Sequence, residues 1–209
     1  GPANYGIVSV YTTWVQVVSI VFGLRINGTL IMGMNEYPAK EQKKYQSSIL
    51  VISLLSYSVF SLLTLLFINI YFKKNTFFVF MVLIHGFGKF SNEFKAGINL
   101  FLSVSLSVST IILSILLMSA FSKANNYWGR ILGESLPYVI AGFAITIIIC
   151  FKGKHLVDFR YWRFCIPLAV PMVFHGLAGL LLNQSDRIML QKMEADSIVG
   201  IYSLAYTFS

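Results

Sequence analysis

Long apolar runs without a charged residue dominate the sequence. Such runs cover 1–24, 45–72, 75–88, 96–122, 135–151, 164–185 and 197–209. A helix rises 1.5 Å per residue, so about 20 apolar residues cross the hydrocarbon core of a bilayer. Several runs reach this length, and none shows the strict alternation over about ten residues that marks the strands of a membrane β-barrel. The pattern therefore predicts an all-α integral membrane protein, a multi-span helical bundle.

The bounds of the predicted helices follow from the runs and the polar residues between them. They cover about 5–24, 47–72, 76–93, 96–121, 131–151 and 164–187, and a further helix starts at 198. The chain does not begin with Met, and its last run is too short to cross a membrane, so we expect an internal piece of a longer protein. On this expectation 1–187 forms an N-terminal transmembrane bundle, and 198–209 is the truncated start of a second bundle.

Composition excludes the soluble classes of protein. Asp, Glu, Lys and Arg make up 11% of the 209 residues and apolar types 56%. A typical soluble domain has roughly 25% charged residues, so this chain has too little charge to cover a water-facing surface. A soluble enzyme, a nucleic-acid-binding module and a disordered tail are excluded.

The basic residues predict the orientation in the membrane. Of the sixteen Lys and Arg residues, four lie in 25–46 and four in 152–163. By the positive-inside rule these two loops are cytoplasmic and residue 1 is external. Basic loops beside anionic lipid also account for the net charge of +8. No basic stripe interleaved with aromatic residues indicates nucleic acid as a partner.

Five of the predicted helices carry polar residues at helical spacing, although a lipid-facing helix should be apolar all round. In 164–187 this polar face runs through His175, Gly179, Asn183 and Asp186, and in 96–121 it consists mainly of Ser and Thr. Small hydroxyl residues allow helices to pack closely and to hydrogen-bond to each other. An aqueous cavity is the other interpretation. The ionisable residues favour the cavity, because a charge at mid-membrane costs about 2.5–3.5 kcal/mol and rarely persists without a partner or a pathway.

Two pairs of oppositely charged residues stand four positions apart. They are Lys89 with Glu93, and Arg130 with Glu134. This spacing lets the two charges neutralise each other on one helix face. Both pairs lie near predicted helix ends, where long side chains can also reach the interface. Snorkelling therefore explains the pairs as well as a cavity does.

A motif near the end of the chain carries a resemblance to a known family. The segment 183–190, Asn-Gln-Ser-Asp-Arg-Ile-Met-Leu, is followed at 199–206 by Val-Gly-Ile-Tyr-Ser-Leu-Ala-Tyr. Together they resemble the bacterial polysaccharide flippases, which export O-antigen and capsule units and belong to the multidrug/oligosaccharidyl-lipid/polysaccharide exporter superfamily. The segments 1–6 and 164–168 resemble the starts of the family's second and seventh helices. The resemblance thus covers the whole chain, as helices two to eight.

This resemblance implies a MATE-like transporter of two helical bundles around a central cavity. It implies a flippase that moves a polyprenyl-pyrophosphate-linked oligosaccharide across the bacterial cytoplasmic membrane by alternating access, for lipopolysaccharide O-antigen or capsule synthesis. Coupling to H⁺ or Na⁺ is expected, as are contacts with membrane lipid and with polysaccharide polymerase or assembly proteins. We expect no enzyme, cofactor or metal, because no phosphate-cradling loop, nucleophile elbow or metal-ligand constellation is present.

The chemistry of this substrate selects candidate site residues. A pyrophosphate needs cations, and the planar guanidinium of Arg binds phosphate oxygens bidentately. Substrate-binding or lumen-lining candidates are Arg25, Lys89, His175, Asn183, Asp186 and Arg187. Asp186 and Glu93 are the candidates for ion coupling. A structural interpretation of Asp186 and Arg187 remains open, in which they form an interfacial ion pair that caps the end of 164–187.

The alternatives to a flippase are another exporter and a membrane-embedded enzyme. The nearest alternative is another exporter of the same superfamily, either a drug/ion antiporter or a flippase for the peptidoglycan precursor. A membrane-embedded glycan polymerase or acyltransferase would need a large loop with paired His, Asp or Arg residues. The longest predicted loop, 25–46, contains neither His nor Asp, which disfavours the enzyme.

Overall fold

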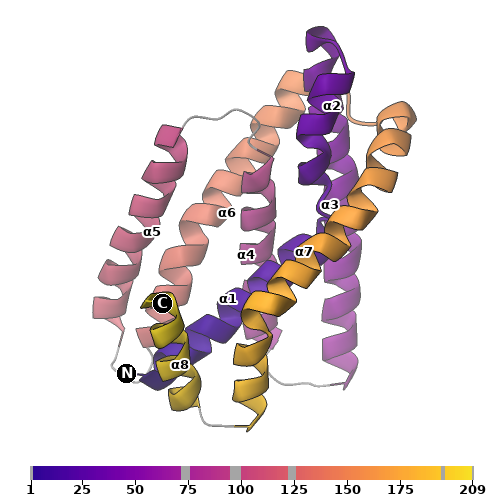
Figure 1. The fold of residues 1–209 in the computed structure, drawn as a ribbon. Coiled ribbons are helices and arrows are strands. Elements are labelled where there is room, and N and C mark those ends of the chain that lie inside the picture. Colours follow the sequence, from indigo (N-terminus) through magenta and orange to yellow (C-terminus); the bar gives the residue numbers. More distant parts are fainter. Residues whose placement is uncertain (1, 72–75, 95–99, 122–125, 194–195, 209) are drawn as a thin grey trace.

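The computed structural model describes residues 2–71, 76–94, 100–121, 126–193 and 196–208 (Figure 1). These residues form eight α-helices and one 3₁₀ helix, and no strand occurs among them. The elements are α1 (Pro2–Phe22), η1 (Ile26–Thr29), α2 (Leu30–Glu36), α3 (Ala39–Tyr71), α4 (Thr76–Glu93), α5 (Leu100–Ala120), α6 (Asn126–Gly153), α7 (Phe159–Met193) and α8 (Asp196–Phe208).

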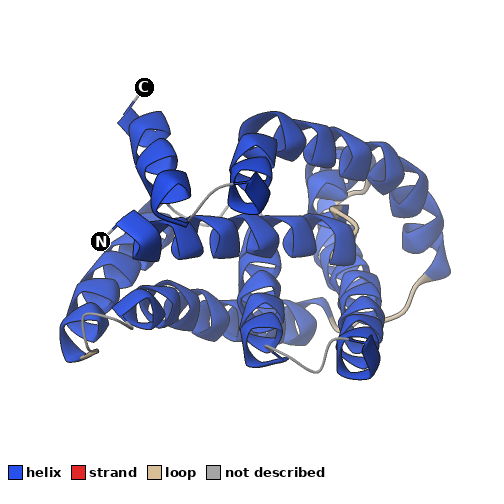
Figure 2. Cartoon of the chain, turned by 90° about the horizontal axis from the view of Figure 1, so that it is seen from below, coloured by secondary structure: helices blue, strands red, loops and turns tan. Residues whose placement is uncertain are grey.

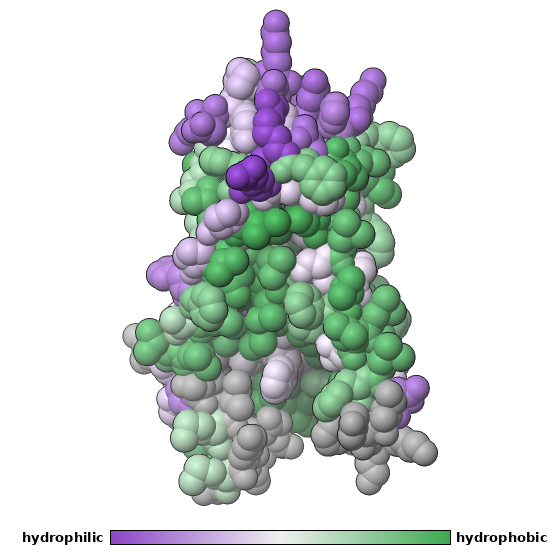
Figure 3. Space-filling model, turned by 90° about the vertical axis from the view of Figure 1, so that its right-hand side faces the viewer, coloured by the Kyte–Doolittle hydropathy of each residue, from purple (hydrophilic) through white to green (hydrophobic). Residues whose placement is uncertain are grey.

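The protein is an all-α, multi-span membrane protein, as the apolar runs predict. Within the described ranges five helices are long and apolar enough to cross a membrane, namely α1, α3, α5, α6 and α7. On the face drawn in Figure 3, apolar residues cover the middle of the molecule and hydrophilic residues gather at one end. Large apolar side chains such as Phe174 and Leu182 are 68% and 83% exposed. Exposure of this kind indicates a surface that contacts lipid.

Helix α1 occupies the centre of the bundle. It packs against α3, α4, α6, α7 and α8, and it crosses the middle of the assembly at a steep tilt (Figures 1 and 2). Tyr11 and Val15 are 0% and 1% exposed. Helix α8 lies along the first half of α1, where the backbone of Gly200 meets that of Pro2 so closely that a Cβ at position 200 has no room. That α8 begins a second bundle remains a prediction.

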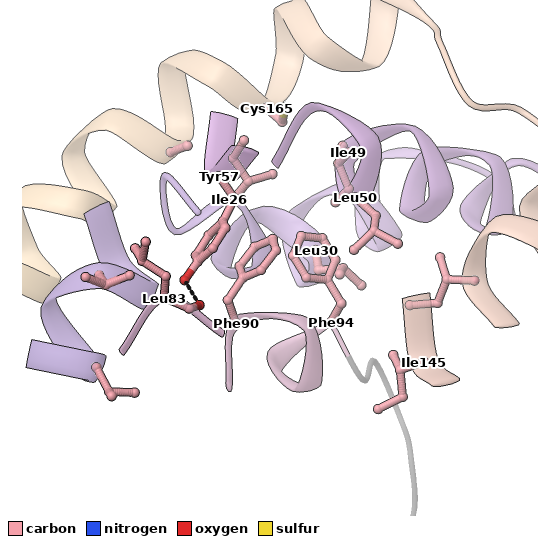
Figure 4. Close-up of a cluster of buried hydrophobic side chains, with 14 of the residues drawn as sticks. Ile26, Leu30, Ile49, Leu50, Tyr57, Leu83, Phe90, Phe94, Ile145 and Cys165 are labelled. Carbon is pink, nitrogen blue, oxygen red and sulfur yellow. Dashed lines mark hydrogen bonds between the residues drawn. The ribbon is translucent and has the colours of Figure 1, made fainter. Parts of the chain in front are cut away.

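A cluster of buried apolar side chains joins α1, α3, α4, α6 and α7 with the segment that follows α1 (Figure 4). Tyr57 of α3 donates a hydrogen bond of 2.7 Å to the Leu83 carbonyl of α4. Phe90 stacks on Tyr57 with ring centroids 5.5 Å apart, and Ile26 of η1 is fully buried beside them. Aromatic pairs of this geometry add to the stabilisation that burial of their area gives. These contacts hold α4 against α3.

Several helices extend beyond the bounds that the apolar runs predict. The predicted loop 25–46 contains η1, α2 and the first turns of α3, which begins at Ala39 rather than at 47. Helix α6 begins at Asn126 rather than at 131, and α7 runs from Phe159 to Met193 rather than from 164 to 187. Hydropathy marks only the part of a helix inside lipid. Residues 39–46 are rich in Lys, Glu and Gln, which favour helix in water as well.

Candidate functional site

A cavity of about 320 Å³ opens between α1, α4 and α7. We call it the α1–α4–α7 cavity. Its polar lining comes from Gln16 and Ser19 of α1, from Lys89 and Glu93 of α4, and from Asn183 of α7. Arg25, which lies between α1 and η1, also lines it. The polar faces that the sequence predicts on three separate helices therefore meet around one space.

Arg25 reaches this cavity because the chain turns sharply after α1. Leu24 and Arg25 have φ values of 51° and 44°, a left-handed conformation that costs non-glycine residues of order 1–3 kcal/mol each. The Arg25 side chain extends toward α7, where a Cβ built on Gly176 would lie 2.8 Å from its Nη1 atom. The strained turn and the missing side chain at Gly176 together hold a guanidinium at the cavity wall.

The cations of the cavity have a carboxylate nearby but no direct ion pair. Glu93 Oε2 accepts a hydrogen bond of 2.8 Å from Asn27 Nδ2, and the charges of Arg25 and Lys89 both act on this carboxylate. Among the residues that the structure describes, the one ion pair in direct contact is Arg160–Glu41, so Lys89 and Glu93 do not form the contact that their spacing allows. Two cations therefore face the cavity without being neutralised by contact.

A second polar cavity, of about 350 Å³, lies between α5 and α6. We call it the α5–α6 cavity. Arg130, Glu134 and Tyr138 line it from α6, and Thr110 and Ser114 line it from α5, with three apolar residues of α5, Ile111, Ile115 and Met118. The charge of Lys89 acts on Glu134 as well as on Glu93. The charge of Lys89 therefore acts on one carboxylate in each of the two cavities.

The other predicted site residues of α7 have different surroundings. Asn183 donates a hydrogen bond of 2.8 Å to the Gly179 carbonyl within its own helix. His175 is exposed and is not among the residues that line the α1–α4–α7 cavity. A step of four residues advances about 40° around a helix, so a face that begins at Asn183 no longer points the same way at His175.

Asp186 lies next to α8 rather than at the cavity wall. It is half-buried, and its Oδ2 atom accepts a hydrogen bond from the Tyr202 hydroxyl. The side chain of Arg187 lies outside the part of the structure that is described. Whether Asp186 and Arg187 belong to the transport path or cap α7 therefore remains a prediction.

Comparison with known families decides what kind of protein this is. The model of a family described as polysaccharide biosynthesis protein matches residues 1–209. The chain belongs to this family. Members of this flippase-type family are generally transporters rather than enzymes, and the chain is accordingly a polysaccharide biosynthesis or export protein. No curated protein and no solved structure matches the chain.

For this polysaccharide biosynthesis protein, two polar residues have surroundings that the sequence does not predict. Glu134 was noted only as a partner of Arg130, yet it lines a cavity. His85 is 1% exposed, and its Nδ1 atom lies 3.2 Å from the Tyr11 hydroxyl. The spacing of His85, Lys89 and Glu93 indicated a polar face of α4. The sequence does not show that α6 is the helix that packs against this face.

Proposed function

We propose that this chain is part of a flippase that translocates a polyprenyl-pyrophosphate-linked oligosaccharide across the bacterial cytoplasmic membrane by alternating access. The observation that carries the proposal is the α1–α4–α7 cavity, in which Arg25 and Lys89 face a polar space without a direct ion pair. Membership of the polysaccharide biosynthesis family supports the same substrate class. The product serves the synthesis of surface polysaccharide, either O-antigen or capsule.

The three parts of such a substrate need three different environments. The polyprenyl tail is apolar and can remain in the lipid that contacts the apolar surface of the protein. The pyrophosphate is an anion and needs cations, which Arg25 and Lys89 supply. The guanidinium of Arg25 binds two phosphate oxygens at once, whereas the Lys89 ammonium acts as a point charge. The glycan needs hydrogen-bonding groups such as those of Gln16 and Asn183.

The excess of cations distinguishes this substrate from that of a drug/ion antiporter. A cavity for cationic drugs would present carboxylates to its contents, whereas here Arg25 and Lys89 outnumber Glu93 among the lining residues. Glu93 lies within reach of both charges and can compete with the pyrophosphate for them. Binding of H⁺ or Na⁺ to Glu93 would release the cations for substrate, which is the coupling step that we propose.

Substitution of Arg25 tests the proposal. Arg25→Gln keeps a flexible polar side chain at this position but removes its charge, so we expect surface polysaccharide to disappear while the lipid-linked intermediate accumulates. Arg25→Lys keeps the charge and should restore part of the export, because bidentate binding is lost. The matched control is Arg163→Gln, since Arg163 is exposed at the start of α7 and does not line this cavity.

The measurement is complementation of a flippase-deficient strain by the complete protein, at equal membrane abundance. Normal polysaccharide from Arg25→Gln would contradict the role of this cavity. If Arg25→Gln instead abolished export of a cationic dye and left polysaccharide unchanged, the protein would be an antiporter of the same superfamily.

A further inference from the structure

The α5–α6 cavity has features of a binding site that neither the helix packing nor the first cavity explains. Arg130, Glu134 and Tyr138 follow one another at steps of four residues on α6, and all three line this cavity. Glu134 lies about two helical turns from the start of α6, within the helix that is long and apolar enough to cross the membrane. Ionisable residues at such depth are costly and mark functional sites by default.

Within the part of the chain that the structure describes, the side chains of Arg130 and Glu134 make no hydrogen bond and no direct ion pair, and the Tyr138 hydroxyl makes no hydrogen bond. The spacing of Arg130 and Glu134 would allow them to neutralise each other, yet they do not touch. A carboxylate, a guanidinium and a phenol are thus all available to a ligand.

Packing of the two helices does not require these residues. Helices α5 and α6 approach each other at Gly129 and Gly133, where added side chains would collide with the backbone of Leu117 and Ser114. This glycine face lies one residue, or about 100°, away from the face of Arg130 and Glu134. Small residues at an interface are sufficient to pack membrane helices closely. The charged face is therefore not part of the packing surface.

The chemistry of the lining indicates what the ligand is. Arg130 and Glu134 carry opposite charges, so the pair favours neither an isolated anion nor an isolated cation. A guanidinium donates, a carboxylate accepts, and a phenol hydroxyl does both, a combination that suits the hydroxyl groups of a sugar. The apolar side chains of Ile111, Ile115 and Met118 suit the C–H faces of a sugar ring.

The position of the cavity relates it to the first one. Lys89 lines the α1–α4–α7 cavity, and its charge also acts on Glu134. Tyr138 lines the α5–α6 cavity and contacts the ring of His85, one turn from Lys89 on α4, at a centroid distance of 5.7 Å. The Nε2 atom of this buried histidine has no hydrogen-bond partner among the described residues. The charge of Lys89 and the contact between His85 and Tyr138 therefore relate the proposed pyrophosphate site to the α5–α6 cavity.

We propose that the α5–α6 cavity is a saccharide-binding subsite, in which Arg130, Glu134 and Tyr138 hold sugar residues of the glycan while its pyrophosphate lies at Arg25 and Lys89. This inference rests on the proposed function. It makes Glu134 a residue for glycan recognition rather than for anion binding.

Protection from a thiol reagent tests the two cavities separately. In the complete protein, Cys150 and Cys165 are replaced by Ala, and one reporter is added at a time. Ile20→Cys reports on the α1–α4–α7 cavity and Met118→Cys on the α5–α6 cavity, because both residues line them without a polar group. The rate of labelling by membrane-permeant N-ethylmaleimide is measured in three strains, which make no lipid-linked intermediate, a lipid diphosphate with one sugar, or the complete repeat unit.

We expect Ile20→Cys to be protected in both strains that make a lipid diphosphate. Met118→Cys should be protected most in the strain that makes the complete repeat unit. Adding Glu134→Gln should remove the protection of Met118→Cys and leave that of Ile20→Cys; if this variant does not accumulate, Tyr138→Phe replaces it.

Labelling of Met118→Cys at one rate in all three strains, with Ile20→Cys protected, would overturn the saccharide subsite and leave the flippase intact. Protection of neither reporter would overturn the proposed function and the subsite with it.

Discussion

At the scale of single residues, two glycines of α7 allow the shape of the cavity to be tested separately from the stability of the helix. Gly176 and Gly179 both line the α1–α4–α7 cavity. A Cβ at Gly176 would press on the Arg25 guanidinium, whereas a Cβ at Gly179 would meet nothing within 4 Å. Because the group that must move is the far end of a flexible side chain, Gly176→Ala should displace Arg25 without disturbing the backbone.

We therefore predict that Gly176→Ala lowers polysaccharide export at unchanged membrane abundance. Gly179→Ala is the matched control and should export normally, since it adds the same methyl group to the same helix one turn away. Complementation at equal expression measures both. Equal export by the two variants would mean that the position of Arg25 does not limit transport.

At the scale of elements, the crossing of α4 and α6 depends on two glycines. A Cβ on Gly88 would lie 2.7 Å from the backbone of Tyr138, and a Cβ on Gly142 would lie 2.9 Å from the Cα atom of Gly88. Asn92 adds an interhelical hydrogen bond of 2.9 Å from Nδ2 to the Tyr138 carbonyl. Small residues with an interhelical hydrogen bond are a common way for helices to associate in lipid.

Gly142→Leu should consequently destabilise the protein. The added side chain would meet the backbone of α4, which cannot move aside as the end of a flexible side chain can. Overpacking of this kind costs about 1–3 kcal/mol or more. Denaturation by sodium dodecyl sulfate in mixed micelles measures the change. Ala144→Leu is the control on the same helix, since Ala144 is exposed and its larger replacement would face lipid. Similar losses from both variants would rule out a specific role for the crossing.

The same elements show what the sequence can predict and what it cannot. Apolar runs identify the helices because lipid demands a minimum length, and the family motif at 183–190 with 199–206 identified the family. The runs do not identify α2, because its seven residues are too few to cross a membrane. Likewise the spacing of Arg130 and Glu134 was visible, but only the packing of α5 on α6 turns that spacing into a cavity.

At the scale of the whole molecule, the two basic segments lie at the same end. The Ser47 hydroxyl near the start of α3 donates a hydrogen bond of 2.8 Å to the carbonyl of His155. The amide of Asp158 donates one of 3.1 Å to the Ser48 hydroxyl. Figure 3 shows hydrophilic residues gathered at one end of the molecule. The positive-inside rule predicts that this end lies in the cytoplasm.

We predict that Lys40→Cys and His155→Cys react with a membrane-impermeant thiol reagent only from the cytoplasmic side. Lys40 and His155 are both exposed, so the reagent can reach these positions. Asn69→Cys, near the other end of α3 and also exposed, should react only from outside. Labelling in intact cells against inverted vesicles measures the sidedness. The reverse pattern would invert the topology and, with it, the direction of transport.

The central position of α1 has a consequence for the order of assembly during biosynthesis. The buried hydroxyl of Ser9 is hydrogen-bonded to that of Ser203, 194 residues later in the chain. A ribosome that adds about 5–20 residues per second needs roughly 10–40 s to cover such a distance. During that interval α1 has been made and α8 has not, so Ser9 has not yet met the hydroxyl that it bonds in the folded protein. Enclosure of this side of α1 must therefore wait for the synthesis of α8.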